Sequence, residues 1–147
     1  MKRFILLSSV LSILLLSIAQ SCTSKPEEGI QFFEGSWQEA LQKAKAENKP
    51  IFLDIYASWC GPCKLLKKRT FTDKDVAAYF NAHFINVSLD GEKGDGAQLA
   101  NKYQIQGYPT LMIIDANENV LVYTMGYYKA NELLQIGQSA FTKGKRR

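Results

Sequence analysis

Two segments of strand length constrain the fold of this chain more than any other feature. "IFLDIYA" at 51–57 is a nearly continuous apolar run, and "HFINVSL" at 83–89 is a second segment of the same kind. Such runs are typical of strands that are covered on both faces. Helical patterns separate the two, so we expect a βαβ unit with parallel strands and helices on both faces of the sheet.

The rest of the chain adds further helices and a hairpin. Ser36 and Glu39 match an S-x-x-E capping box at the start of a helix over 37–48. Helical patterns also cover 64–71, 72–82, 97–103 and 129–141, with Thr72 or Asp73 as the cap of the second. Strands at 110–115 and 120–125 flank "ANEN" and predict an antiparallel hairpin. We therefore expect an α/β fold with a central mixed sheet, in the order α-β-α-β-α-β-β-α, with room for a short first strand near "IQFF".

Two cysteines, Cys60 and Cys63, follow the first apolar segment within "WCGPC". A zinc site would need two further ligands, but the chain has one histidine, His83, which we place at the start of the second strand, and no second C-x-x-C. A purely structural disulfide across two residues would close a very small loop and stabilise little. The pattern favours a redox-active pair and no metal.

The N-terminus has the pattern of a secretory signal. Lys2 and Arg3 precede an apolar stretch at 4–19, which is short for a spanning helix of about 20 residues. Cleavage after Ala19 is one interpretation. In the other, "IAQSC" resembles a bacterial lipobox, residues 1–21 are removed, and Cys22 becomes a lipidated first residue. Because lipidation leaves one cysteine pair among three cysteines, it is the favoured interpretation.

Charge and composition divide the remaining chain. The segment 22–30 is polar and predicts a flexible tether, 31–142 predicts one domain, and 143–147 is a basic tail. The net charge of +4 arises at the two ends of the chain, because the residues between the signal and the tail carry more acidic than basic side chains. Nothing in this balance points to nucleic acid, and we expect a monomer.

Together these motifs resemble the thioredoxin family. "WCGPC" lies between a buried strand and a helix, "GYPT" at 107–110 stands where that family carries a cis-proline, and "MGYY" at 125–128 carries a glycine before the last helix. The resemblance covers residues 31–142. Residues 49–81 are most similar to secreted bacterial members, including the C-terminal domain of the membrane-bound thiol:disulfide interchange reductase. It implies a thioredoxin fold, a protein-disulfide oxidoreductase and no cofactor.

The resemblance gives each residue of the motif a role. Cys60 is expected at the N-terminus of a helix, where free N–H groups and the helix dipole favour the attacking thiolate. Cys63, one turn later, would attack the mixed disulfide and release the product. Pro62 suits an early helical position because its missing N–H would be unpaired there, and Gly61 would let a partner chain approach.

Asp54 is a further candidate, because it stands inside the apolar run "IFLDIYA". Burial should raise the pKa of its carboxyl group. The resemblance implies that Asp54 assists proton transfer at Cys63. Family members often pair this acid with a lysine on the next strand, and "HFINVSL" contains none.

Residues outside the motif are expected to bind substrate. A cis bond before Pro109 would place the backbone of Tyr108 beside the disulfide, where it could pair with an extended peptide. Trp59 is expected to pack beside the cysteines and shield them. Four basic residues are expected to form the wet face of the active-site helix: Lys64, Lys67, Lys68 and Arg69.

The sequence thus predicts an extracytoplasmic thiol:disulfide oxidoreductase, tethered to a bacterial membrane through Cys22 and located in the periplasm. Gly-Pro between the cysteines favours a reductant of protein disulfides, which would need recharging by a membrane electron-donor protein. The alternatives are a protein-binding or chaperone module on the same scaffold, a disulfide oxidase or isomerase, and a metal-handling C-x-x-C protein.

Overall fold

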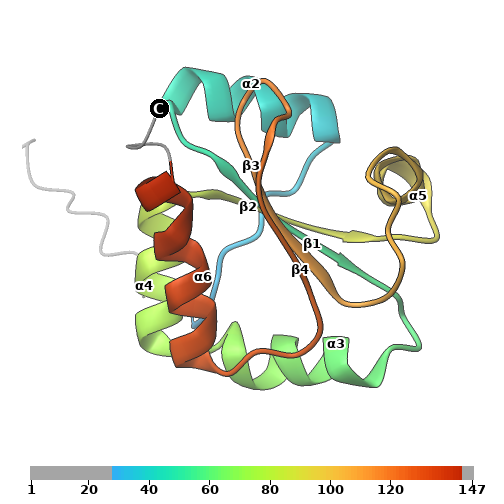
Figure 1. Ribbon diagram of the computed structural model, residues 1–147, viewed down its shortest axis with the longest axis vertical. Helices are drawn as coiled ribbons and strands as arrows, with labels where there is room; N and C mark the ends of the chain where they lie inside the picture. The colour runs from blue at the N-terminus through green and yellow to red at the C-terminus, as the bar shows by residue number, and fades with distance from the viewer. Residues whose placement is uncertain (1–27, 144–147) are drawn as a thin grey trace, which may run out of the picture.

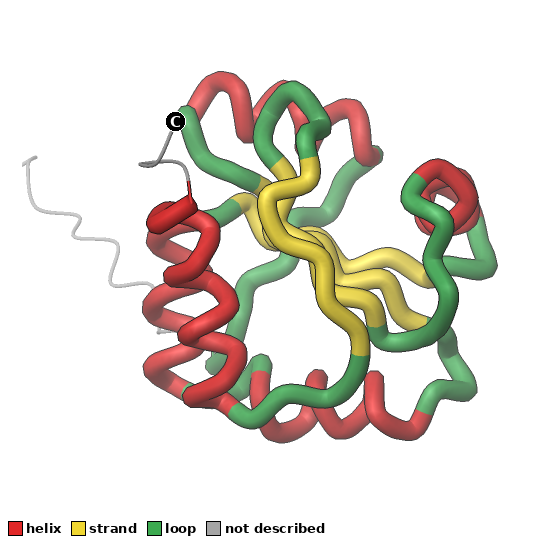
Figure 2. Tube along the Cα trace, viewed as in Figure 1, coloured by secondary structure: helices red, strands yellow, loops and turns green. Residues whose placement is uncertain are grey.

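A four-stranded mixed sheet forms the centre of the molecule in a computed structural model that describes residues 28–143 (Figures 1 and 2). The strand order is β2-β1-β3-β4. β1 (Ile51–Tyr56) pairs in parallel with β2 (Ile85–Asp90), as expected of a βαβ unit. β3 (Thr110–Ile114) and β4 (Val120–Met125) form the predicted hairpin, and β3 runs antiparallel to β1. The predicted mixed sheet is confirmed.

Helices cover both faces of this sheet. α2 (Trp37–Glu47) and α5 (Gly94–Lys102) lie at the top and right of Figure 1 and contribute side chains to one apolar cluster. The opposite face is covered by α4 (Lys74–His83), α6 (Ala130–Lys143) and the π-helical segment η1 (Leu66–Thr70), which continues α3 (Gly61–Leu65). The sequence predicted the helices but not the π-helical turn.

Local signals fix where the helices begin and end. The Ser36 side chain accepts a hydrogen bond from the Glu39 N–H, and the Glu39 carboxylate accepts one from the Ser36 N–H, which completes the predicted capping box. Asn48 ends α2 in the left-handed conformation, with φ of 49°. Of the two candidate caps for α4, Asp73 is the one that binds the first turn.

Alternate residues of β1 point into the two separate cores. Ile51, Leu53 and Ile55 belong to the cluster under α2 and α5, while Phe52 belongs to the cluster under α4 and α6. Asp54 follows Phe52 by two positions and therefore faces the second side. The carboxyl end of β1 leads directly into the cysteine motif, so this strand places both the acid and the thiols.

Three expectations are wrong in detail. Residues 30–33 form no strand, although the Phe33 N–H donates to the carbonyl of Asn86 at 2.7 Å. Ile30, assigned to the tether, is packed in the second core. His83 ends α4 and does not begin β2, since its ring Nδ1 lies 2.8 Å from the Tyr79 carbonyl one turn earlier.

Several predictions fall outside the described residues. These are the signal at 1–21, Cys22 and most of the tether, and the tail from 144 onward. Within residues 28–143, the helices are all too short or too polar to cross a membrane.

Candidate active site

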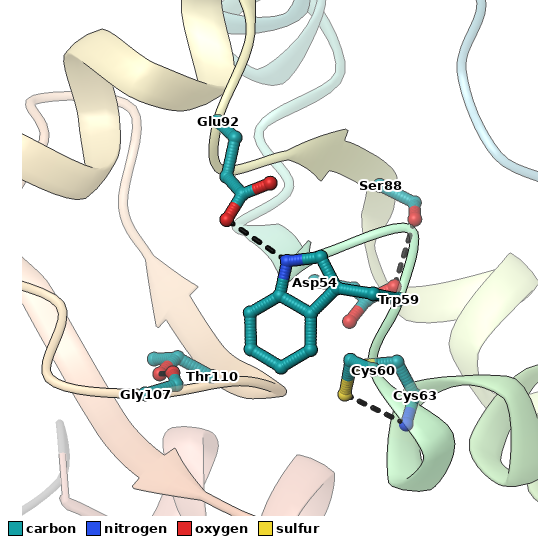
Figure 3. The surroundings of a disulfide bond; sticks show 8 residues. All are labelled: Asp54, Trp59, Cys60, Cys63, Ser88, Glu92, Gly107 and Thr110. Atoms are coloured by element: carbon teal, nitrogen blue, oxygen red, sulfur yellow. Dashed lines mark hydrogen bonds between the residues drawn. A yellow bond between two sulfur atoms is a disulfide. The ribbon is translucent and has the colours of Figure 1, made fainter.

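The two cysteines form a disulfide at the start of α3 (Figure 3). Cys60 is the N-cap of this helix, and its Sγ accepts a hydrogen bond from the Cys63 N–H at 3.1 Å. Gly61 and Pro62 form the first turn, where the missing N–H of proline leaves no unpaired donor. Both cysteines are buried, and the S–S distance is 2.05 Å. Cys60 therefore has the helix N-terminal position that the sequence predicted.

Asp54 is buried beneath this helix, with 1% of its surface exposed. Its Oδ2 accepts a hydrogen bond from the Ser88 hydroxyl at 2.7 Å, while its Oδ1 has no hydrogen-bond partner within the described part of the chain (Figure 3). Burial raises the pKa of Asp54 to about 6, against the lowering effects of the Ser88 hydrogen bond and the Lys67 charge. The predicted upward shift is confirmed.

Ser88 occupies the place on β2 directly beside the acid. The parallel register pairs Asp54 with Ser88, so their side chains lie on the same face of the sheet. The lysine that family members often carry on this strand is absent here, and the Ser88 hydroxyl binds the carboxylate instead. Ser88 was not predicted from the sequence, because it is separated from Asp54 by 34 positions and becomes its neighbour only through strand pairing.

The nearby positive charge comes from η1. The Lys67 ammonium lies 3.2 Å from the centroid of the Tyr56 ring, a cation–π contact. Tyr56 in turn packs against the cluster of Ala57, Cys60 and Cys63. Desolvation by burial lowers the pKa of Lys67, while the carboxylates of Asp54 and Asp90 oppose that change. Lys67 was expected on the wet helix face; it is solvent-exposed, but its ammonium is anchored over Tyr56.

The signal for Lys67 was its position four residues after Cys63, one helical turn along the same face. Lys67 lies in the π-helical turn, where the Phe71 N–H bonds the Leu66 carbonyl five residues back at 2.9 Å. Such turns are frequent at functional sites. Nothing in the local sequence predicted one here.

The Trp59 side chain reaches the loop that follows β2. It is 67% exposed, and its indole Nε1 donates to Glu92 Oε1 at 3.0 Å (Figure 3). Its ring meets that of Tyr108 edge-on, with centroids 6.0 Å apart. Tyr108, which is partly buried, packs against the cysteine cluster. That Trp59 shields the cysteines stays a prediction, and its contact with Glu92 was not predicted from the sequence.

The peptide bond between Tyr108 and Pro109 is cis, as the resemblance implied. The Pro109 carbonyl accepts a hydrogen bond from the Gly126 N–H at 2.9 Å, and the Thr110 hydroxyl donates to the Gly107 carbonyl at 2.7 Å. These contacts fix the loop before β3. Burial raises the pKa of Tyr108, and the carboxylates of Glu92 and Asp90 raise it further.

No group of three or more histidine, cysteine or acidic side chains within residues 28–143 is placed to hold a metal ion. The chemistry available at this site is that of two sulfur atoms, one buried carboxyl group, a hydroxyl and an ammonium. Such a set can exchange disulfides and move the accompanying protons.

Comparisons with known proteins agree with this geometry. A family model described as Thioredoxin-like matches residues 33–116. The thiol:disulfide interchange protein DsbD of Colwellia psychrerythraea is 32% identical over 108 residues, which cover 71% of this chain and 18% of that protein. This chain therefore spans less than a fifth of the length of that relative.

Solved structures extend the likeness to the whole domain. The solution structure of a proposed disulphide isomerase from Bacteroides thetaiotaomicron is 44% identical, with a TM-score of 0.70, and the match covers 78% of this chain and 94% of that one. The reduced C-terminal domain of DsbD from Neisseria meningitidis shares the fold at 23% identity, with a TM-score of 0.59 and coverage of 70% and 92%. The chain belongs to the thioredoxin-like family, as a disulfide oxidoreductase with a C-x-x-C pair at Cys60 and Cys63.

Proposed function

We propose that this protein reduces disulfides in other proteins outside the cytoplasm, with Cys60 as the nucleophile and Cys63 as the resolving thiol. The observation that carries the proposal is the Cys60–Cys63 disulfide at the N-terminus of α3, next to a buried carboxyl group with one unpartnered oxygen. In the reduced state, the N–H of Cys63 is available to stabilise a thiolate at Cys60.

The reaction has two exchange steps. The Cys60 thiolate attacks a substrate disulfide, forms a mixed disulfide and releases one substrate thiolate, which takes a proton from water. Cys63 then gives its proton to the Asp54 carboxylate and attacks Cys60 Sγ. The Cys60–Cys63 disulfide forms, and the second substrate sulfur leaves as a thiolate. The substrate gains two electrons and the dithiol loses two.

Asp54 is suited to accept the proton of Cys63 near neutral pH. Its pKa is about 6, so it is mostly ionised at pH 7, yet closer in pKa to a thiol than an exposed aspartate is. Burial supplies this shift, since an ionised carboxylate is costly in an apolar environment.

Substrate is proposed to dock over Trp59, Tyr108 and the cis-Pro109. Trp59 offers an exposed aromatic ring, and Tyr108 links that ring to the cysteine cluster. An extended substrate segment would pair with the backbone at Tyr108 and present its sulfur to Cys60. Gly61 has nothing within 4 Å of an added Cβ, which is consistent with open space beside the disulfide.

Direction and location are part of the proposal. Gly-Pro between the cysteines favours electron donation, and the signal and lipobox pattern favours a monomer tethered through Cys22 in a bacterial periplasm. A reductant in an oxidising compartment must be recharged, so the partner would be a membrane electron-donor protein. The curated relatives are named thiol:disulfide interchange proteins, which supports the same type of chemistry.

Trapping tests the assignment of roles. Cys63→Ser in the full-length protein should accumulate mixed disulfides through Cys60, detected by non-reducing electrophoresis and mass spectrometry. The matched control, Cys60→Ser, should accumulate far fewer. If Cys63→Ser yields no adducts in cells, or if a double cysteine-to-serine variant retains full function, the reductase proposal fails and a binding module is favoured.

Isomerase activity is the second candidate, because the relative at 44% identity is itself described as a proposed disulphide isomerase. Measurement of the Cys60–Cys63 reduction potential separates the two. A reduction potential of about −270 mV, as in thioredoxin, supports the reductase. A potential of about −180 mV or higher supports an isomerase or oxidase. Mass analysis of the mature N-terminus tests the lipid on Cys22.

A further inference from the structure

A proton that reaches Asp54 in each turnover must also leave it, and the docking side is poorly suited for that exit. The carboxyl group is buried, and a substrate joined to Cys60 would cover the surface formed by Trp59 and Tyr108. Ser88 is the one described hydrogen-bond partner of the carboxyl group. An exit for the proton is therefore expected on the side of Ser88.

A pocket of about 410 Å³ lies on that side. Ser88, Tyr56 and Lys67 line it, together with apolar side chains that include Phe32 and Phe71. Ser88 therefore lies between the acid and the pocket, because its hydroxyl donates a hydrogen bond to Asp54 and the residue also lines the pocket. The pocket is one hydrogen bond away from the buried carboxyl group.

The pocket is separate from the proposed docking surface. β2 is an edge strand, and Ser88 is half-buried at this edge. Neither Trp59, Tyr108 nor Pro109 lines the pocket. A substrate over those residues would leave the pocket accessible, so proton exchange there need not wait for product release.

We propose that Asp54 exchanges its proton with solvent through this pocket by way of the Ser88 hydroxyl, with Lys67 as the charged group at its rim. This inference rests on the proposed role of Asp54 at Cys63. Protonated Asp54 gives its proton to Ser88 Oγ, while the Ser88 hydroxyl gives its own proton to a water molecule in the pocket. Ser88 ends as a hydroxyl, Asp54 as a carboxylate, and the water carries the proton away.

Few charged groups face Asp54 from the elements packed against it. β2 supplies the Ser88 hydroxyl and η1 the Lys67 ammonium, while the partner on β3 is the apolar Leu111. At the pocket, Tyr56 holds Lys67 by its ring, and Glu28 contributes a carboxylate to the lining. Ser88 and Lys67 are thus positioning residues for the titration of Asp54.

Carbon-13 NMR of the Asp54 carboxyl group tests the proposal on the full-length protein. Ser88→Ala removes the relay hydroxyl, and Ser88→Thr keeps it. Lys67→Gln removes the charge at the rim of the pocket. Lys68→Gln removes the charge of the neighbouring lysine, which does not line the pocket, and is the matched control. The carboxyl signal gives both the midpoint of titration and, from its line shape, the rate of proton exchange. The rate at which Cys63 resolves a Cys60 mixed disulfide is measured in parallel across pH.

Ser88→Ala and Lys67→Gln should both move the Asp54 midpoint upward, because each removes a group that favours the carboxylate. At pH values below the midpoint, every unit of upward shift lowers the ionised fraction, and with it the resolving rate, about tenfold. Ser88→Ala should also broaden or split the carboxyl signal through slow exchange, which Ser88→Thr should reverse. Lys68→Gln should leave midpoint and line shape in place.

The outcomes separate this inference from the proposed function. If Ser88→Ala keeps the midpoint and the fast exchange of the wild type, the route through the pocket is refuted, even if Asp54→Asn slows the resolving step. If Asp54→Asn resolves mixed disulfides at the wild-type rate, the role of Asp54 itself fails. A midpoint shift with Lys68→Gln equal to that with Lys67→Gln would refute a specific role for Lys67.

Discussion

The two faces of β1 are both largely buried, but they differ in chemistry. On one face, Ile51, Leu53 and Ile55 pack into a wholly apolar cluster under α2 and α5. On the other, Phe52 is followed by Asp54 and then by Tyr56, which leads to the cysteines. One strand thus carries a stabilising face and a reactive face, and adjacent residues should respond oppositely to substitution. The two faces can be compared by changing one residue at a time.

The largest effect is expected on the apolar face. Leu53→Ala removes a fully buried side chain and should lower the free energy of unfolding by about 2–5 kcal/mol. The loss should be nearly independent of pH, because the buried members of this cluster are side chains that carry no charge between pH 4 and pH 8. Urea unfolding at pH 4 and pH 8 measures both points. Val120→Ala, at an exposed position of β4, is the control and should cost far less.

A strongly pH-dependent loss in Leu53→Ala would contradict this separation of the faces. It would mean that the cavity reaches Asp54, and that the two sides of the strand are not independent.

The adjacent residue should behave in the opposite way. The folded protein raises the pKa of Asp54 from 3.8 to about 6, so folding favours the protonated acid. The free energy of unfolding therefore has its full value below pH 4, where the acid is protonated in both states. It falls by up to about 3 kcal/mol as the pH rises through 6 and the buried acid ionises. Asp54→Asn, which cannot ionise, should therefore be more stable than the wild type at pH 8 and similar to it below pH 4.

Urea unfolding across this range measures the difference, with Asp73→Asn as a control at the cap of α4, where the acid is not buried. Equal stability of Asp54→Asn and wild type at pH 8 would contradict the cost of burying this charge. In the same variant, the resolving step should slow, since the amide cannot accept the proton of Cys63.

These paired predictions show what the sequence could establish about the site. The acid was recognisable in "IFLDIYA" because a charge within an apolar run is unusual, and the cysteines were recognisable from their spacing. Ser88 was not, because a serine in "HFINVSL" carries no signal until the register pairs it with Asp54. A shift of one residue would place Ser88 on the opposite face.

Contacts between residues far apart in the chain also explain where the fold differs from the sequence-based prediction. Apolar runs and caps predicted the strands, the hairpin and the capping box of Ser36. The π-helical turn has no such local signal, and its residue Leu66 is packed in the second core. "IQFF" has the composition of a strand, but it makes one backbone hydrogen bond to β2, too few for a ladder. Long-range contacts decided each of these cases.

Gly91 connects the apolar face to the docking surface and should give an intermediate effect. A Cβ added there would lie 2.7 Å from Ile55 Cγ2 and 2.6 Å from Tyr108 Cε1. Gly91→Ala should therefore cost about 1–3 kcal/mol through overpacking and displace the Tyr108 ring. Urea unfolding measures the cost, and reduction of a protein disulfide measures the effect on docking. Gly107→Ala, which meets nothing within 4 Å, is the control. A neutral Gly91→Ala would show that Tyr108 moves freely.

The smallest effect on stability is expected at the exposed end of the site, at the hydrogen bond between Trp59 and Glu92. Like the bond at Asp54, it ends on a carboxylate oxygen, but it is exposed to solvent. Glu92 accepts from the Trp59 indole, as Asp54 accepts from Ser88, but both residues of the first pair are exposed. Glu92→Ala should change the free energy of unfolding by less than about 0.5 kcal/mol. It should nevertheless shift the NMR signal of the Trp59 indole N–H, which Glu92→Gln should preserve because the amide oxygen can still accept.

The indole signal of Trp37, which donates to Glu118, serves as the internal control and should not move. A loss of more than about 1 kcal/mol in Glu92→Ala would be larger than an exposed hydrogen bond ordinarily contributes, and would show that Trp59 is part of the folded core. An unchanged Trp59 signal would show that the bond is absent in solution. The expected result, a local change without a stability cost, would mean that Glu92 orients the indole for docking, whereas Ser88 and Asp54 act where burial makes each polar contact costly to lose.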